Sequence, residues 1–245
     1  MRIDILTLFP GMFTGPMTES MIKRAQEAGH LDLGIHDMRE HATDKHRMAD
    51  DRPFGGGAGM VIKPDMVFAA VESLPRTERT RIIMTCPQGK RFEQADANAL
   101  AEEEHLMFLC GHYEGFDERV REHLVTDEYS IGDYVLTNGE LPAMVMLDAI
   151  VRLIPGVVGK EESTKEDSFY TGILDYPHYT RPVDFRGWQV PEILRSGNHG
   201  AIQRWRRDEA LKRTFERRPE LLASAPLDRK DLKFLKEQCG WEPNR

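Results

Sequence analysis

The sequence predicts an α/β domain with a largely parallel sheet, followed by a small all-helical domain. In the first part of the chain, short apolar runs alternate with segments of helical periodicity, a pattern typical of parallel strands joined by helices. Residues 159–175 are charged and small, and strand signals vanish from about residue 176. We therefore expect an α/β domain over 1–158, a flexible linker over 159–175 and a helical domain over 176–245.

The elements of the first domain follow from the spacing of apolar residues and from flanking Gly, Pro and polar residues. Strands are expected at residues 3–9, 31–38, 80–86, 106–110 and 131–136. Helices are expected at residues 18–28, 65–73, 93–104, 117–124 and 141–154. Residues 39–60 are polar and Gly-rich, which favours a long loop.

Composition excludes several classes of protein. The 245 residues are 40% hydrophobic, and no apolar run approaches the length of a membrane span. The start of the sequence shows no export signal, so we expect a cytoplasmic protein without a membrane partner. Cys86, Cys110 and Cys239 have no paired or metal-type spacing and are interpreted as reduced thiols. The nine histidines show no metal-ligand pattern, so no metal ligands are predicted.

The charge is distributed unevenly along the chain. A net charge of −8 argues against indiscriminate binding to nucleic acid, because affinity for phosphate comes from Lys and Arg. Residues 202–218, however, hold seven Arg or Lys side chains against three acidic ones. A specific nucleic-acid contact is therefore expected there, through Arg204, Arg206 and Arg207, with a solvated helix face as the alternative.

Three predicted strands end in unusual loops, at residues 86–92, 110–119 and 130–142. Ligands of open α/β sheets bind outside the carboxyl ends of strands, so these loops are expected to form one crevice. Their glycines would let backbone groups approach a ligand closely, although each could also be a simple turn glycine. Neither a GxGxxG fingerprint nor a phosphate loop is present, which weakens an ordinary dinucleotide-binding interpretation.

The predicted helix at 141–154 is apolar nearly all round, so it is expected to be buried. Its charged residues, Asp148 and Arg152, lie four apart on one face. They could form a structural ion pair, or Arg152 could recognise a planar, hydrogen-bonding group such as a base edge. Asp167 stands among several acids, and its surroundings in the sequence do not distinguish it.

Long motifs resemble the bacterial tRNA (guanine-N1)-methyltransferase family, whose members act at position 37 of tRNA. The matching segments occur in the family's order and span nearly the whole chain, at residues 51–60, 110–120, 130–144, 174–182, 196–206 and 217–222. The resemblance implies a SPOUT-class α/β fold with a deep trefoil knot. It also implies S-adenosylmethionine as methyl donor, tRNA as substrate and a homodimer whose active site is shared between subunits.

The resemblance also carries residue roles. It implies Asp167 as general base and Arg152 as the guanine-facing cation. The S-adenosylmethionine pocket would be formed by Pro87, Gly111, Glu114, Ile131, Gly132, Asp133, Tyr134, Val135, Leu136, Gly139 and Pro142.

Two residues depart from the family's pattern. His112 stands where many relatives have Arg, and Asn138 stands where many have Gly. The family also depends on Mg²⁺. Because the sequence shows no dedicated set of metal ligands, Mg²⁺ is retained only as a possible cofactor. Two other classes of protein are weighed against the methyltransferase. A non-catalytic RNA-binding protein would leave the three loops unexplained, and a nucleotide-dependent oxidoreductase would lack its GxGxxG fingerprint.

Overall fold

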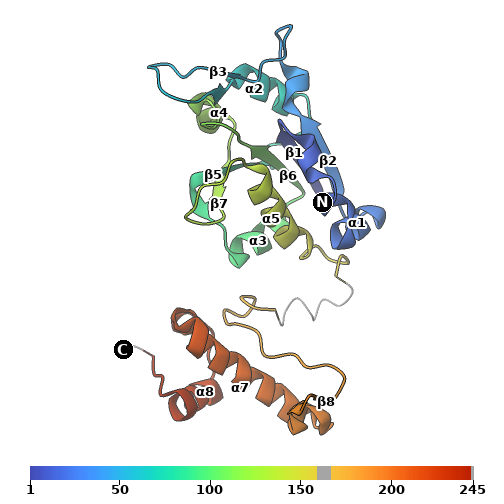
Figure 1. The fold of residues 1–245 in the computed structure, drawn as a ribbon, viewed down its shortest axis with the longest axis vertical. Coiled ribbons are helices and arrows are strands. Elements are labelled where there is room, and N and C mark those ends of the chain that lie inside the picture. Colours follow the sequence, from blue (N-terminus) through green and yellow to red (C-terminus); the bar gives the residue numbers. More distant parts are fainter. Residues whose placement is uncertain (159–166, 244–245) are drawn as a thin grey trace. The chain divides into compact units, whose positions relative to one another are not determined.

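The computed structural model describes residues 1–158 and 167–243 and divides the chain into two compact units, Met1–Gly159 and Lys160–Arg245. Figure 1 gives the order of the elements along the chain.

The first unit is built on a five-stranded sheet with the strand order β2-β1-β6-β5-β7. Its strands are β1 (Arg2–Thr7), β2 (Asp32–Asp37), β5 (Arg81–Arg91), β6 (His105–Cys110) and β7 (Asp127–Ser130), and every neighbouring pair is parallel. The short strands β3 (Asp50–Asp51) and β4 (Val61–Ile62) form a separate antiparallel pair. The predicted α/β class and parallel sheet are confirmed.

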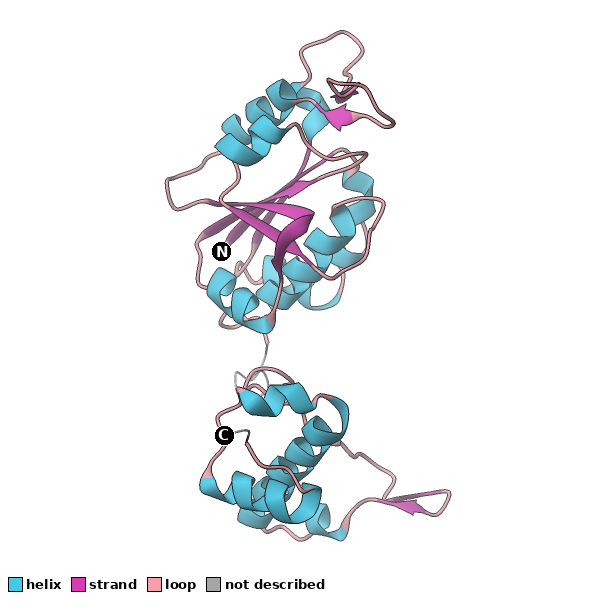
Figure 2. Cartoon of the chain, turned by 90° about the vertical axis from the view of Figure 1, so that its left-hand side faces the viewer, coloured by secondary structure: helices cyan, strands magenta, loops and turns pink. Residues whose placement is uncertain are grey.

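Helices cover both faces of this sheet, as Figure 2 shows. They are α1 (Ser20–Glu27), α2 (Pro64–Glu72), α3 (Gln94–Ala101), α4 (Glu118–His123) and α5 (Glu140–Val151). One apolar cluster joins α1, α3 and α5 to the sheet, and a second joins α2 and α4 to it. Because both faces are buried, the inner strands are mostly apolar rather than alternating, although β1 also buries the carboxylate of Asp4.

Two strand predictions need correction. Strand β5 does not end at Pro87 but continues to Arg91, with a register shift against β7 between Thr85 and Lys90. Such an irregularity accommodates proline, which has no N–H to donate to the ladder. The strand expected at 131–136 is absent: β7 ends at Ser130, and residues 131–136 form a loop.

The second unit contains α7 (His199–Arg217) and α8 (Arg229–Phe234), with 3-10 turns at Glu192–Arg195 and Pro219–Ala223. The side chain of Asn198 caps α7 by accepting a hydrogen bond from the backbone N–H of Ala201 at 3.1 Å. A small apolar cluster forms its core, made of Ile173, Ala210, Leu211, Leu222 and Leu235 with their partly buried neighbours.

This unit differs from an all-helical domain by one hairpin, formed by β8 (Asp184–Phe185) and β9 (Trp188–Gln189). Strands of two residues are too short for periodicity to reveal. The predicted linker also differs in part. Its residues 159–166 lie outside the described residues, whereas Ile173 is buried in the second core and the N–H of Leu174 donates to Thr214 Oγ1 at 3.0 Å.

None of the described helices combines the length and the apolar character that a bilayer crossing requires.

Candidate functional site

One cavity of about 380 Å³ lies at the carboxyl ends of β5, β6 and β7. All three loops singled out in the sequence contribute to its wall: the first through Pro87, the second through Gly111 and the third through Gly132. The sheet topology explains this meeting, since parallel strands carry their carboxyl ends to the same edge. The expected crevice is therefore present as a single hollow in the first unit.

Close backbone contacts hold the second and third loops together. The N–H of Gly139 donates to the carbonyl of Gly111 at 2.7 Å, and Thr85 Oγ1 donates to the carbonyl of Gly139 at 3.1 Å. A Cβ atom on Gly139 would lie 2.4 Å from Thr85 Oγ1 and 2.7 Å from the nitrogen of Gly111. Only glycine fits at this crossing, which fixes one wall of the cavity.

The third loop is also shaped by its own side chains. Ser130 Oγ donates to the carbonyl of Gly132 at 3.0 Å, and the hydroxyl of Tyr134 donates to the carbonyl of Ile131 at 3.3 Å. Tyr134 and Val135 are exposed although they line the cavity. Hydrogen bonds within the loop therefore fix its shape and leave the ring of Tyr134 open beside the cavity.

Most of the predicted donor-site residues lie together here. Asp133 does not line the cavity, whereas its chain neighbours Gly132 and Tyr134 do. His112 and Asn138, the two departures from the family's pattern, both line the cavity and pair through an isolated antiparallel bridge. The other predicted residues that line it are Pro87, Gly111, Glu114, Ile131, Gly132, Tyr134, Val135, Leu136, Gly139 and Pro142.

A buried carboxylate behind the cavity was missed in the sequence. Glu140 is the first residue of α5 and is fully buried. Thr7 Oγ1 donates to Glu140 Oε1 at 2.5 Å, linking the end of β1 to the start of α5. Burial raises the pKa of the Glu140 carboxyl, because water no longer solvates its charged form. In the sequence, Glu140 follows Gly139 in a polar turn, and this context does not predict that its side chain is buried.

A second hollow of about 750 Å³ lies at the opposite, amino-terminal ends of β1 and β2. It is wide open, and its wall includes Met1, Arg2, Leu31 and Ile154. Ligands of parallel sheets bind at the carboxyl edge, so the smaller cavity is the better candidate site.

The two predicted catalytic residues belong to different units. Arg152 is half-buried and directly follows α5, where its backbone N–H donates to the carbonyl of Asp148 at 3.3 Å. Asp148 is exposed, as are Leu141 and Val145, so α5 is not buried all round as expected. Asp167 is half-buried at the start of the described part of the second unit.

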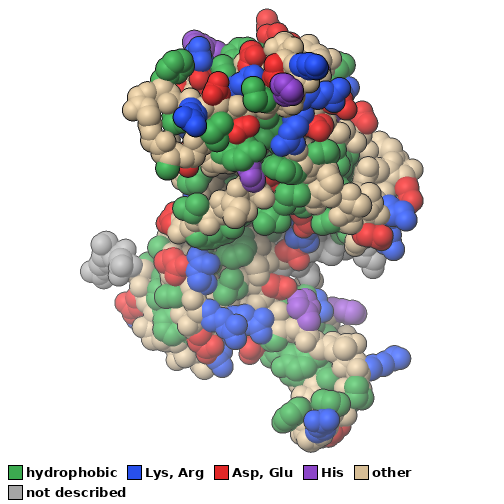
Figure 3. Space-filling view, turned by 45° about the horizontal axis from the view of Figure 1, so that its top comes forward, with side chains coloured by type: hydrophobic (Ala, Val, Ile, Leu, Met, Phe, Trp, Pro, Cys, Tyr) green, Lys and Arg blue, Asp and Glu red, His purple; other side chains and the backbone are tan. Residues whose placement is uncertain are grey.

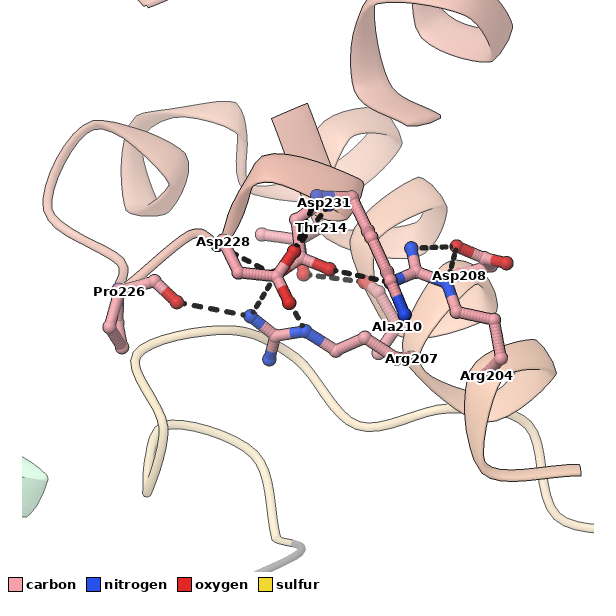
Figure 4. A network of polar contacts seen from close by, with 9 residues as sticks. Arg204, Arg207, Asp208, Ala210, Thr214, Pro226, Asp228 and Asp231 are labelled. Atoms are coloured by element: carbon pink, nitrogen blue, oxygen red, sulfur yellow. Dashed lines mark hydrogen bonds and ion pairs between the residues drawn. The ribbon is translucent and has the colours of Figure 1, made fainter. Parts of the chain in front are cut away.

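Two of the three predicted tRNA-binding arginines are engaged inside the second unit (Figure 4). Asp231 is almost fully buried, and its two oxygens accept from Arg204 Nη1 at 3.1 Å and from Arg207 Nη2 at 2.8 Å. Arg204 Nε also donates to Asp208 at 2.9 Å. These guanidinium groups hold α7 against α8, a structural role that the spacing of charges along α7 could not indicate.

Arg206 makes a different contact. Its guanidinium lies 4.8 Å from the centre of the Tyr176 ring, a cation–π arrangement. That these three arginines bind tRNA stays a prediction. Arg204 and Arg207 also have a structural role, because both pair with the buried Asp231.

Within residues 1–158 and 167–243, no group of three or more His, Cys, Asp or Glu side chains is arranged to hold a metal ion.

Comparison with known proteins gives concordant results. The family model of tRNA (guanine-1)-methyltransferase TrmD matches residues 1–224. The chain is 57% identical over 246 residues to a tRNA (guanine-N(1)-)-methyltransferase of Geobacillus kaustophilus, with both chains covered completely. It is also 57% identical over 239 residues to the protein of the same description from Bacillus cereus strain AH820, covering 97% of this chain and 98% of the relative.

Proposed function

This chain belongs to the tRNA (guanine-1)-methyltransferase family TrmD, and from that premise we propose that it transfers a methyl group from S-adenosyl-L-methionine to N1 of guanosine 37 in tRNA. Methyl transfer to a guanine of tRNA is the activity in the family's description. The observation that carries the finer proposal is the cavity formed by the three loops at the carboxyl edge of the sheet.

The residues of this cavity fit S-adenosylmethionine. The 131–138 loop would offer backbone groups for hydrogen bonding to an adenine edge, and the ring of Tyr134 offers an apolar face. The close crossing of Gly111 and Gly139 brings the backbone of the second and third loops together at the cavity wall. S-adenosylmethionine supplies an activated methyl group on its sulfonium, so the protein's main contribution is in-line positioning of donor and acceptor.

Asp167 and Arg152 are proposed to act on the guanine. N1 carries a proton and is a poor nucleophile until that proton leaves, so a positioned carboxylate is needed as base. We assign this role to Asp167. Negative charge then develops on O6, and the guanidinium of Arg152 would stabilise it electrostatically.

We further propose a homodimer with a shared active site. Exposed apolar side chains gather at the third loop and on one face of α5, where Leu141 and Val145 lie four residues apart. Apolar surface of this kind beside an active site favours burial against another protein surface. A second copy of the chain covers it in the proposal, and Asp167 of one subunit serves the cavity of the other. The SPOUT-class trefoil knot and the cytoplasmic location are part of the same proposal, whereas Mg²⁺ is not.

The test is product mapping. Purified protein, S-adenosylmethionine with a labelled methyl group, and a tRNA with guanosine at position 37 should yield 1-methylguanosine after nuclease digestion. The same tRNA with adenosine at position 37 is the matched control and should acquire no label. Label on another nucleotide, or none on either tRNA, would contradict the proposed function.

A further inference from the structure

The β8–β9 hairpin exposes aromatic side chains that nothing in its own unit covers. Phe185 is 51% exposed and Trp188 is 69% exposed, whereas the aromatic residues of the second core are at least half-buried. Figure 2 shows the hairpin projecting from the helices of the second unit. In Figure 3 hydrophobic side chains and Lys or Arg side chains lie close together on this projection.

The hairpin holds these side chains in a defined arrangement. Phe185 and Trp188 are directly opposite each other in the register, with ring centres 6.1 Å apart. The turn between them consists of Arg186 and Gly187, both with positive φ, as a tight two-residue hairpin turn requires. Asp184 fastens the turn, because its carboxylate accepts from the N–H of Gly187 at 2.9 Å and from Gln189 Nε2 at 3.2 Å.

Charge on this projection favours an anionic partner. Arg186 stands at the tip with its guanidinium 5.1 Å from the centre of the Phe185 ring. Arg181 and Arg195 are also exposed in the same stretch, against two acids, Asp184 and Glu192. Three arginines against two acids make residues 181–195 locally positive in a chain whose net charge is −8.

We propose that the β8–β9 hairpin is an RNA-binding arm, on which Trp188 stacks against an unpaired base of the tRNA while Arg186 contacts the adjoining phosphate. Exposed aromatic rings next to arginines are the usual platform for unpaired bases, since every base has a π-face. The inference rests on tRNA being the substrate. It also supplies a contact that does not depend on Arg204 and Arg207, which hold the unit together.

The test compares three variants at one position in the full-length protein. Trp188→Ala and Trp188→Leu both remove the π-face, whereas Trp188→Tyr retains one. Loss of stacking should weaken tRNA binding roughly 5- to 100-fold in the first two variants, with Trp188→Tyr close to wild type. Affinity for S-adenosylmethionine should be unchanged in all three. Tyr170→Leu, an exposed aromatic residue outside the hairpin, is the matched control and should bind tRNA normally.

The outcomes separate this inference from the proposed function. Native tRNA affinity in Trp188→Leu and Trp188→Ala, in protein that still methylates tRNA, would overturn the arm and leave the enzyme intact. Native affinity in Trp188→Leu with weak binding in Trp188→Tyr would indicate an apolar protein contact instead, and would equally overturn it. A wild-type protein that neither binds nor methylates tRNA would remove the proposed function itself.

Discussion

At the scale of single residues, Glu140 stabilises the turn that forms one wall of the cavity. Its carboxyl group is fully buried, and its hydrogen bond from Thr7 ties β1 to the first turn of α5, whose Gly139 forms the wall of the cavity. A buried carboxyl favours its neutral form, which explains the raised pKa. This residue therefore couples the stability of the first unit to pH.

The sign of that coupling is testable with Glu140→Gln, which keeps an oxygen for Thr7 but cannot ionise. The stability that neutral Glu140 contributes is fully present below the unfolded-state pKa of about 4.3, and it is lost as the pH rises through the higher folded-state pKa. We expect the Tm of Glu140→Gln relative to wild type to increase between pH 4 and pH 8. A difference in Tm that stays constant over this range would contradict the assignment.

Asp167 is the other residue whose chemistry can be isolated. Asp167→Asn keeps the size and hydrogen-bonding capacity of the side chain but cannot accept the N1 proton. Single-turnover methyl transfer should fall by at least roughly 100-fold, the usual contribution of a general base. Binding of tRNA and of S-adenosylmethionine should change little, since the base acts mainly in the transition state. An unaltered rate would show that another group takes the proton.

At the scale of elements, the apolar runs of the inner strands were sufficient to predict β1, β5 and β6, because strands buried on both faces leave a strong signal. The edge strand β2 is only partly buried and was predicted from the alternation of apolar and polar residues instead. The same signal misled at residues 131–136, where Val135 and Leu136 suggested a strand but are exposed in a loop. The sequence also could not reveal the partners of Arg204 and Arg207. Their common acceptor, Asp231, lies 27 and 24 residues away, and only tertiary folding brings it close.

Removing one of those partners should destabilise the second unit specifically. Arg207→Ala leaves buried Asp231 with Arg204 as its remaining cation, at a cost of about 2 kcal/mol for hydrogen bonds to a charged group. All three tryptophans lie at positions 188, 205 and 241, so the urea unfolding of this unit can be followed by their fluorescence. In an Asp231→Asn background the same substitution should cost clearly less. Equal costs in both backgrounds would show that the pair is not coupled.

The third loop offers a paired test of the donor site. Tyr134 lines the cavity, whereas its neighbour Asp133 is exposed and does not. Tyr134→Ala should weaken S-adenosylmethionine binding in calorimetry, and Asp133→Ala should leave it nearly unchanged, with both proteins folded. Equal effects of the two substitutions would mean that the loop as a whole, rather than the cavity wall, determines affinity.

At the scale of the whole molecule, the candidate functional residues are distributed over both units. The first unit holds the cavity and the second holds Asp167, α7 and the β8–β9 hairpin. The resemblance of long motifs to a known family indicated both parts from the sequence. Physical patterns alone gave the sheet and its three loops, but they could not select Asp167 among its acidic neighbours.

The central claim is that Asp167 of one subunit takes the N1 proton of a guanine whose methyl donor is bound in the cavity of the other subunit, and complementation tests it most directly. Asp167→Asn is mixed with Gly111→Val, whose added side chain would crowd Phe116 at the cavity wall. Differently tagged chains verify that heterodimers have formed. Each parent should be inactive, and the heterodimer, with one intact composite site, should regain about half of the wild-type activity per dimer. Verified heterodimers that stay inactive would contradict the shared site.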